Sequence, residues 1–295
     1  MQTDAPVGII GLGLMGTTLS RRLIGAAIPV IGFDVDLDRC DSLRENRGMV
    51  AASVRELADR SRAIVIAVYS GLQAEMVFGD IENSPARPAI ICTTTCAPNE
   101  IVRLAARAAN AGISFIEAPI SGASTEVGDG TAMALVAGAD SAIDAVSTLL
   151  DVLCPRRIRI GAVGDASRAK LAINLILQIN RAALAEGIVL AERLGLDGHA
   201  FLAAARASAA YSRVMDTKGE KMLSRDFRPQ SHISQTLKDA ELMLAEAARK
   251  NLRLPLTEAQ AGLLRAAIAI EGPDSDSAAI IEAVRQRPAS PEASR

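Results

Sequence analysis

Two hydrophobic patterns alternate along the first half of the chain. Short runs of consecutive aliphatic residues, bounded by glycine, proline or polar residues, are typical of buried strands. Between these runs, apolar residues recur every three or four positions, which is the spacing of a helix with one apolar face. The patterns predict strands at residues 7–10, 28–34, 63–68, 89–92 and 113–117, and helices at residues 17–26, 37–46, 53–60 and 99–109.

This alternation predicts the fold class of the first part of the chain. Strands that alternate with helices form βαβ units, in which the strands run parallel and helices cover both faces of the sheet. We therefore expect an α/β domain with a doubly wound parallel sheet over residues 1–162. Two further strands, at 131–136 and 158–161 on either side of a helix at 141–153, are expected to extend the same sheet.

No strand-like run follows residue 162. The pattern predicts a long helix at 163–195 and further helices at 196–208, 211–223, 232–250 and 254–270. We expect these helices to form an all-helical second domain over residues 163–287, joined to the first domain by the long helix. Residues 288–295 are rich in proline, serine and alanine, and are expected to be a flexible tail.

The turn after the first predicted strand contains a glycine motif. It has the sequence GLGLMG and consists of Gly11, Leu12, Gly13, Leu14, Met15 and Gly16. In such a turn the first glycine permits the bend, the second lets the backbone approach a pyrophosphate, and the third lets helix and strand pack closely. Its place between a strand and a helix predicts a Rossmann-type dinucleotide site. The alternative is a glycine-rich turn that binds no ligand.

Asp34 lies at the end of the second predicted strand, 18 residues after Gly16. An acidic side chain in this place accepts hydrogen bonds from the ribose hydroxyls of NAD and repels the 2′-phosphate of NADP. Asp36 adds a second negative charge, and the first arginine after Asp34 is Arg39. The sequence therefore favours NAD over NADP as the cofactor.

Composition argues against several classes of partner. The chain of 295 residues has 32 basic and 34 acidic residues, a formal charge of −2, which does not favour nucleic acid or an acidic membrane surface. The most apolar run, residues 171–179, is interrupted by Asn174 and Gln178 and is shorter than a membrane span. No signal peptide is visible. The four cysteines match neither a disulfide framework nor a metal motif, so we expect a cytoplasmic protein without a metal.

Polar residues at three places have the chemistry of a substrate site. Residues four apart on a helix share a face, so the ammonium of Lys170 and the amide of Asn174 are expected to point the same way. Thr93, Thr94 and Thr95 follow a strand at the sheet edge where ligands bind. Ser121 with Gly122 offers a hydroxyl and an amide suited to a carboxylate. Each has a structural alternative: a solvated lysine, a hydroxyl that satisfies local backbone, or a plain turn.

Four motifs occur together in one order along the chain. They are GLGLMG, EAPISGA with a later GDGT, VGDASRAKLAIN, and TLKDAELMLAEA. With these motifs the chain resembles the β-hydroxyacid dehydrogenase family, which includes 3-hydroxyisobutyrate dehydrogenase and tartronate semialdehyde reductase, with 6-phosphogluconate dehydrogenase as a longer relative. The resemblance covers essentially the whole chain. It implies a Rossmann domain followed by a helical domain that forms a dimer, and we expect a homodimer or homotetramer.

The resemblance also implies a reaction and a role for single residues. The reaction is the NAD(P)-dependent interconversion of a short 3-hydroxy carboxylic acid and its semialdehyde or 3-oxo acid, with hydride passing to or from C4 of the nicotinamide. Lys170 matches the catalytic lysine, a general acid and base. Substrate binding is implied for Ser121, Gly122, Ala123 and Asn174, and cofactor binding for Thr95 and Lys238 beside the glycine turn and Asp34.

Departures from the family pattern leave the identity of the hydroxy acid open. The usual second glycine after Ser-Gly is Ala123, the acidic residue that starts this segment is Glu117 rather than the commoner aspartate, and the residue before Asn174 is Ile173. Two other functions remain as alternatives. Imine reductases share the GLGxMG opening but lack the lysine, and a non-catalytic nucleotide-binding module is expected to have lost it.

Overall fold

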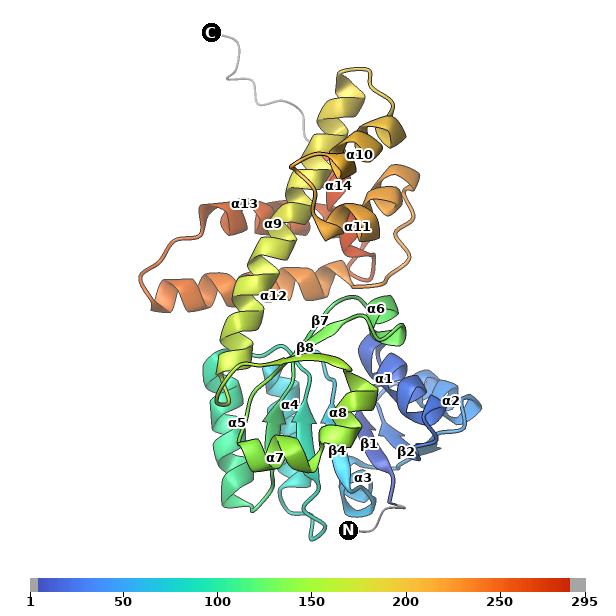
Figure 1. Ribbon diagram of the computed structural model, residues 1–295, viewed down its shortest axis with the longest axis vertical. Coiled ribbons are helices and arrows are strands. Elements are labelled where there is room, and N and C mark those ends of the chain that lie inside the picture. Colours follow the sequence, from blue (N-terminus) through green and yellow to red (C-terminus); the bar gives the residue numbers. More distant parts are fainter. Residues whose placement is uncertain (1–4, 287–295) are drawn as a thin grey trace. The chain divides into compact units, whose positions relative to one another are not determined.

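The computed structural model describes residues 5–286 (Figure 1). The tail expected at 288–295 and the last residue of the expected helical domain lie outside these described residues. The chain divides into two compact units, one that ends at Lys170 and one that starts at Leu171. The division falls inside the long helix α9 (Asp165–Arg193), which runs without interruption through this point.

Six parallel strands form the sheet of the first unit, in the order β3-β2-β1-β4-β5-β6 (Figure 1). The strands are β1 (Val7–Ile10), β2 (Val30–Phe33), β3 (Met49–Val50), β4 (Ala63–Ile66), β5 (Ala89–Cys92) and β6 (Phe115–Glu117). The central strands are in register, with Ile10 beside Phe33 on one side and Ile66 on the other. The predicted doubly wound parallel sheet is confirmed, and β3 is an additional short edge strand.

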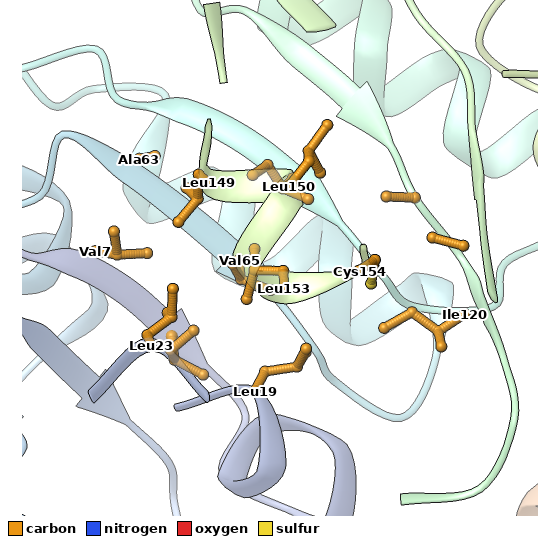
Figure 2. Close-up of a cluster of buried hydrophobic side chains, with 14 of the residues drawn as sticks. Val7, Leu19, Leu23, Ala63, Val65, Ile120, Leu149, Leu150, Leu153 and Cys154 are labelled. Carbon is orange, nitrogen blue, oxygen red and sulfur yellow. The ribbon is translucent and has the colours of Figure 1, made fainter. Parts of the chain in front are cut away.

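Helices cover both faces of this sheet. They are α1 (Leu14–Gly25), α2 (Leu37–Glu45), α3 (Val54–Arg60), α4 (Gly71–Ile81), α5 (Pro98–Asn110), α7 (Asp140–Ala145) and α8 (Ser147–Leu153). Alternate residues of a strand point to opposite faces. Val7 of β1 therefore belongs to the same buried cluster as Leu23 of α1 and Leu153 of α8 (Figure 2), whereas Ile10 belongs to the cluster with α3, α4 and α5. Helix α4 was not predicted.

A second, three-stranded sheet replaces the expected extension of the first. It contains β7 (Ile120–Ser121), β8 (Met133–Val136) and β9 (Arg156–Arg159), and the short helix α6 (Ser124–Gly128) follows β7. The chain changes sheets at Pro119: the Ala118 amide still donates to Cys92 of β5, but the Pro119 carbonyl accepts from Leu135 of β8. Because proline has no N–H to donate, the first sheet ends there.

The helix expected at 141–153 is also different. It is divided into α7 and α8 at Val146, whose backbone angles, φ −114° and ψ 13°, are not helical. The division lets α8 place Leu149, Leu150 and Leu153 on the sheet (Figure 2).

The second unit is helical, as predicted. After α9 it contains α10 (Gly198–Ala207), α11 (Arg213–Ser224), α12 (Ile233–Arg249), α13 (Pro255–Glu271), a short 3-10 helix η1 (Ser277–Ala279) and α14 (Ile280–Gln286). Its core is a separate cluster of buried aliphatic side chains that includes Ile188, Leu202, Met222, Ala240 and Leu264. The last two helical segments were not predicted from the sequence.

Helix α9 is apolar over much of its length but also carries polar side chains on a buried face. Its 29 residues have a window of mean hydropathy 1.3, so by length and composition alone it could cross a membrane, although only the shorter run at 171–179 stood out in the sequence. A buried core helix passes the same test. Gln178 lies on a buried face, where it donates to the Thr236 carbonyl of α12 and accepts from Gln260 of α13. These buried hydrogen bonds are those of a helix packed inside a protein.

Candidate active site

In the glycine turn between β1 and α1, two glycines are required by packing and the third leaves space for a ligand. A Cβ on Gly11, which has φ +90°, would lie 2.6 Å from the Ala67 carbonyl oxygen, and one on Gly16 would lie 1.8 Å from that of Gly11. Both glycines are therefore required by the protein's own packing. A Cβ on Gly13 would meet nothing closer than Arg39 Nη1 at 3.8 Å. The space above Gly13 is open, which fits a pyrophosphate that approaches the backbone closely.

The same turn presents the start of a helix. Gly13 is the N-cap of α1, and no side chain caps its first turn, which Leu14, Met15 and Gly16 form. The first amides of a helix lack partners within the helix and carry a partial positive charge. An uncapped helix N-terminus at the carboxyl end of a parallel strand can bind the phosphates of a dinucleotide.

Asp34 is held firmly against this turn. Its Oδ2 accepts from the Leu12 amide at 2.6 Å, and its Oδ1 accepts from the Asp36 amide at 2.9 Å. The structure thus joins the glycine turn and Asp34, as the sequence predicted. Arg39 was treated in the sequence as too far away to matter, but its Nη1 lies 3.5 Å from Asp34 Oδ2. Arg39 lies in the first turn of α2, and its guanidinium is half-exposed.

The three threonines after β5 do not serve the same purpose. Thr93 donates to the Ile66 carbonyl at 3.0 Å, and Thr94 both accepts from the Val68 amide and donates to the Val68 carbonyl, each at 3.1 Å. These two hydroxyls tie the ends of β4 and β5 together, so the structural alternative holds for them. Thr95 is half-buried in the same loop and is the candidate for a ligand contact.

The segment after β6 presents Ser121 at the end of β7 and Gly122 in the turn before α6. Within residues 5–286 the Ser121 hydroxyl makes no hydrogen bond, so it can still donate and accept. The next amide, that of Ala123, is already occupied because it donates to Glu126 Oε2 at 2.9 Å. A carboxylate can therefore bind to Ser121 more readily than to the amide of Ala123.

Lys170 and Asn174 lie on one face of α9, and both side chains are buried. In the second unit, Asn174 Nδ2 donates to Asp239 Oδ2 at 3.0 Å, and Lys238 Nζ lies 3.1 Å from Asp239 Oδ1. Asp239 therefore brings together two residues that the sequence had singled out. Asn174 Oδ1 is buried and has no partner among the described residues, so it can accept a hydrogen bond from a ligand.

Sequence reasoning gave no role to Asp239 or Arg39. Asp239 directly follows Lys238 inside the motif TLKDAELMLAEA, so the motif contained the signal. The first unit supplies the buried amine of Lys170 and the hydroxyl of Ser121. The second unit supplies the unpaired amide oxygen of Asn174 and the ammonium of Lys238. Between residues 5 and 286, no three His, Cys, Asp or Glu side chains gather as a metal site.

Comparison with known protein families matches nearly the whole chain. Residues 6–161 match the model described as the NAD-binding domain of 6-phosphogluconate dehydrogenase. Residues 164–284 match the model described as "NAD-binding of NADP-dependent 3-hydroxyisobutyrate dehydrogenase". The 2-hydroxy-3-oxopropionate reductase of Escherichia coli is 28% identical over 94% of this chain and 96% of its own length.

Solved structures agree with this match. The crystal structure of 3-hydroxyisobutyrate dehydrogenase from Salmonella typhimurium is 25% identical, with a TM-score of 0.86 over 95% of this chain and 99% of that one. Psf3, solved in complex with NADP+ and 2-OPP, is 25% identical, with a TM-score of 0.82 over 94% and 99%. An imine reductase from Pseudomonas sp. is 22% identical over 95% and 99%, with a TM-score of 0.67, which shows the fold alone.

Proposed function

This chain belongs to the β-hydroxyacid dehydrogenase family, and we propose that it interconverts a short 3-hydroxy carboxylic acid and its semialdehyde or 3-oxo acid. As a member of that family it is an NAD(P)-dependent oxidoreductase. The observation that supports the reaction is the pair Lys170 and Asn174, buried on one face of α9, with Asn174 Oδ1 left without a partner. The likeness of this chain to an imine reductase extends to the fold alone.

Each step needs a group on the protein. The nicotinamide, when bound, takes or gives the hydride, and the protein must hold the substrate and move the hydroxyl proton. We assign that proton to Lys170, which donates to the carbonyl oxygen during reduction and accepts from the hydroxyl during oxidation. Asn174 Oδ1 accepts from a substrate hydroxyl, and Ser121 with Gly122 binds the carboxylate.

The binding of NAD(P) and the preference for NAD over NADP rest on different observations. Binding of NAD(P) follows from the family, and the open space above Gly13 fits it. We propose that NAD is preferred to NADP, because the buried Asp34 carboxylate lies where a 2′-phosphate would bring further negative charge. Thr95 and Lys238 are proposed as further contacts to the cofactor.

Assembly and location are also proposed. Apolar side chains at the end of α9 and just after it are exposed, namely Leu190, Leu194 and Leu196. They support a homodimer or homotetramer, which light scattering of the purified protein tests. The four cysteines are buried and free, which is consistent with a cytoplasmic protein.

The test is reduction of NAD+ and NADP+ by the purified protein with a panel of short 3-hydroxy acids and related sugar acids. We expect activity on at least one acid, and a loss of roughly 10² to 10⁴ in kcat for Lys170→Ala with cofactor affinity unchanged. Lys250→Ala, at an exposed lysine after α12, is the matched control and should keep full activity. No activity across the panel in a protein that still binds NAD(P) would instead favour an imine reductase or a non-catalytic nucleotide-binding module.

A further inference from the structure

Glu117 makes a contact that the reaction itself does not explain. It ends β6, and its side chain is completely buried. Its carboxylate accepts three hydrogen bonds from the start of α9: from the Gly164 amide at 2.6 Å, from the Ser167 amide at 2.5 Å, and from the Ser167 hydroxyl. Residues about fifty positions apart in the sequence are thereby joined within the first unit.

Glu117 thus caps helix α9 from another element, strand β6. The first amides of a helix have no partner within it and carry partial positive charge, so an anionic acceptor stabilises them. Asp165, the first residue of α9, is turned back toward the preceding loop, where its Oδ2 accepts from the Ala162 amide at 3.1 Å. Burial raises the pKa of Glu117, and the hydrogen bonds from Ser167 and Gly164 oppose that shift by favouring the carboxylate.

The backbone of Glu117 is fixed on both sides. It pairs with Cys92 of β5, and it exchanges two hydrogen bonds of 2.9 Å with Ala137, the only link of strand type between the two sheets in the described residues. Its side chain therefore extends from a rigid point. An aspartate is one methylene shorter, so the glutamate here has the reach to meet α9.

Lys170 lies one turn of α9 after Ser167. Residues three apart on a helix share a face, and one turn rises by about 5.4 Å. A carboxylate that holds the amide and hydroxyl of Ser167 therefore fixes the turn from which Lys170 projects. Without the Glu117 carboxylate, the start of α9 would lose three hydrogen bonds, and its first turn would fray or shift. A displacement of 1 Å at a reacting group costs on the order of 10²-fold in rate.

We propose that Glu117 is a positioning residue for Lys170, with its buried carboxylate fixing the first turns of α9. This inference rests on the proposed function of Lys170 as the acid and base. It also links two parts of the first unit, because Glu117 starts the segment that presents Ser121 and Gly122. A single buried carboxylate thus fixes the start of the helix and lies in the strand that leads to the serine.

The experiment is a double-mutant cycle with Glu117→Gln and Lys170→Ala, measured as kcat on the best acid of the panel. Glutamine keeps the size and one acceptor but places an NH2 group against backbone donors. We expect Glu117→Gln alone to lower kcat roughly 10- to 100-fold. The affinity for NAD(P) should stay unchanged, because Glu117 is not part of the glycine turn that would hold the cofactor. In the Lys170→Ala background the same change should have no further effect.

The controls separate positioning from stability. Glu282→Gln removes an equally buried carboxylate, held by Arg225 and Arg285 in the second unit, and should lower the Tm while leaving kcat at 25 °C unchanged. Ser167→Ala removes one of the three contacts to Glu117 and should show a smaller effect with the same dependence on Lys170, even if Glu117→Gln folds poorly.

The outcomes are distinct. If Glu117→Gln and Ser167→Ala keep full kcat, or slow the Lys170→Ala protein by the same factor as the wild type, then Glu117 does not act through Lys170 and the inference is wrong. If instead Lys170→Ala itself remains fully active, it is the proposed function of Lys170 that fails. Loss of kcat that disappears in the Lys170→Ala background supports the inference.

Discussion

At the residue scale, we expect the choice between NAD and NADP to depend on two opposite charges at the end of β2. The Asp34 side chain is nearly buried and is fixed by the amides of Leu12 and Asp36, whereas Arg39 is half-exposed and lies beside both acids. A carboxylate in this place favours the ribose hydroxyls of NAD, but a nearby arginine can bind the 2′-phosphate of NADP. The buried and doubly held Asp34 is the fixed charge, so NAD is the expected cofactor.

We expect Asp34→Asn to lower the ratio of kcat/KM with NAD+ to kcat/KM with NADP+ by roughly tenfold, equivalent to about 1.4 kcal/mol. Asparagine keeps an oxygen for the Leu12 amide but removes the charge that repels a 2′-phosphate. Arg39→Ala should lower kcat/KM with NADP+ more than with NAD+. Steady-state kinetics of both cofactors at saturating acid measure the change. A wild-type protein that prefers NADP+, and loses this preference in Arg39→Ala, would assign selectivity to Arg39 instead.

At the element scale, the β1–α1 turn allows the requirements of the fold and of the ligand to be measured separately. Gly13→Ala introduces a Cβ into open space at a residue with φ −67°, which alanine adopts easily, so stability should change by no more than about 0.5 kcal/mol. Cofactor affinity should nevertheless fall at least about tenfold, because the methyl group occupies the place of the pyrophosphate.

Gly16→Ala, in contrast, should lower stability. Its Cβ would lie 1.8 Å from the Gly11 carbonyl oxygen, so the turn must shift, at a cost of about 1–3 kcal/mol in stability. Thermal unfolding and titration of NADH fluorescence measure the two effects. Equal loss of stability in both variants, or unchanged NADH affinity in Gly13→Ala, would contradict a pyrophosphate site above Gly13.

The elements also show how far the sequence could predict the structure. The strands and helices around the glycine turn were predictable because their hydrophobic periods are local, and β1 and β5 have the expected bounds. Helix α4 was missed because it starts at a glycine, Gly71, and a second glycine, Gly79, interrupts its pattern. The change of sheets at Pro119 was not predictable, because the choice of partner strand depends on residues far away in the chain.

The candidate site follows the same division. The glycine motif, Asp34, Lys170 and Asn174 could be found from motif and spacing, and their roles stay predictions. The contacts of Glu117 with Ser167 and of Asn174 with Asp239 join residues more than forty positions apart, and no local pattern encodes them. Arg39 is only five residues from Asp34, but its approach depends on where α2 begins relative to β2.

At the scale of the whole molecule, the helical unit has a charged pair in its interior. Lys218 of α11 and Asp276 are both buried, and Lys218 Nζ lies 2.8 and 2.9 Å from the two carboxylate oxygens. The amides of Gln230 and Ala278 also donate to Asp276. Burial would raise the pKa of Asp276, but the charge of Lys218 and these hydrogen bonds together hold it below its usual range.

The stability of this unit should therefore depend on pH through Lys218. Burial lowers the pKa of Lys218 from 10.5 to about 8, which Asp276 only partly offsets and which Arg181 reinforces. Between pH 8 and 10.5 the unfolded chain binds the proton that the folded chain has released, so folding becomes more favourable as pH rises. At pH 7 Lys218 is an ammonium in both states, but only the folded state buries it, so its desolvation opposes folding.

We therefore expect the free energy of unfolding of the wild type, relative to Lys218→Met, to rise by about 3 kcal/mol in total across this window, with most of the rise between pH 8 and 10. Methionine cannot titrate, so the difference isolates Lys218 from the other lysines. Urea unfolding followed by circular dichroism at pH 7.5, 8.5 and 9.5 measures it. A difference in unfolding free energy that stays constant or falls with pH would contradict this prediction. It would mean that Lys218 remains an ammonium throughout this range, because its ion pair with Asp276 fully offsets the free energy of desolvating the lysine.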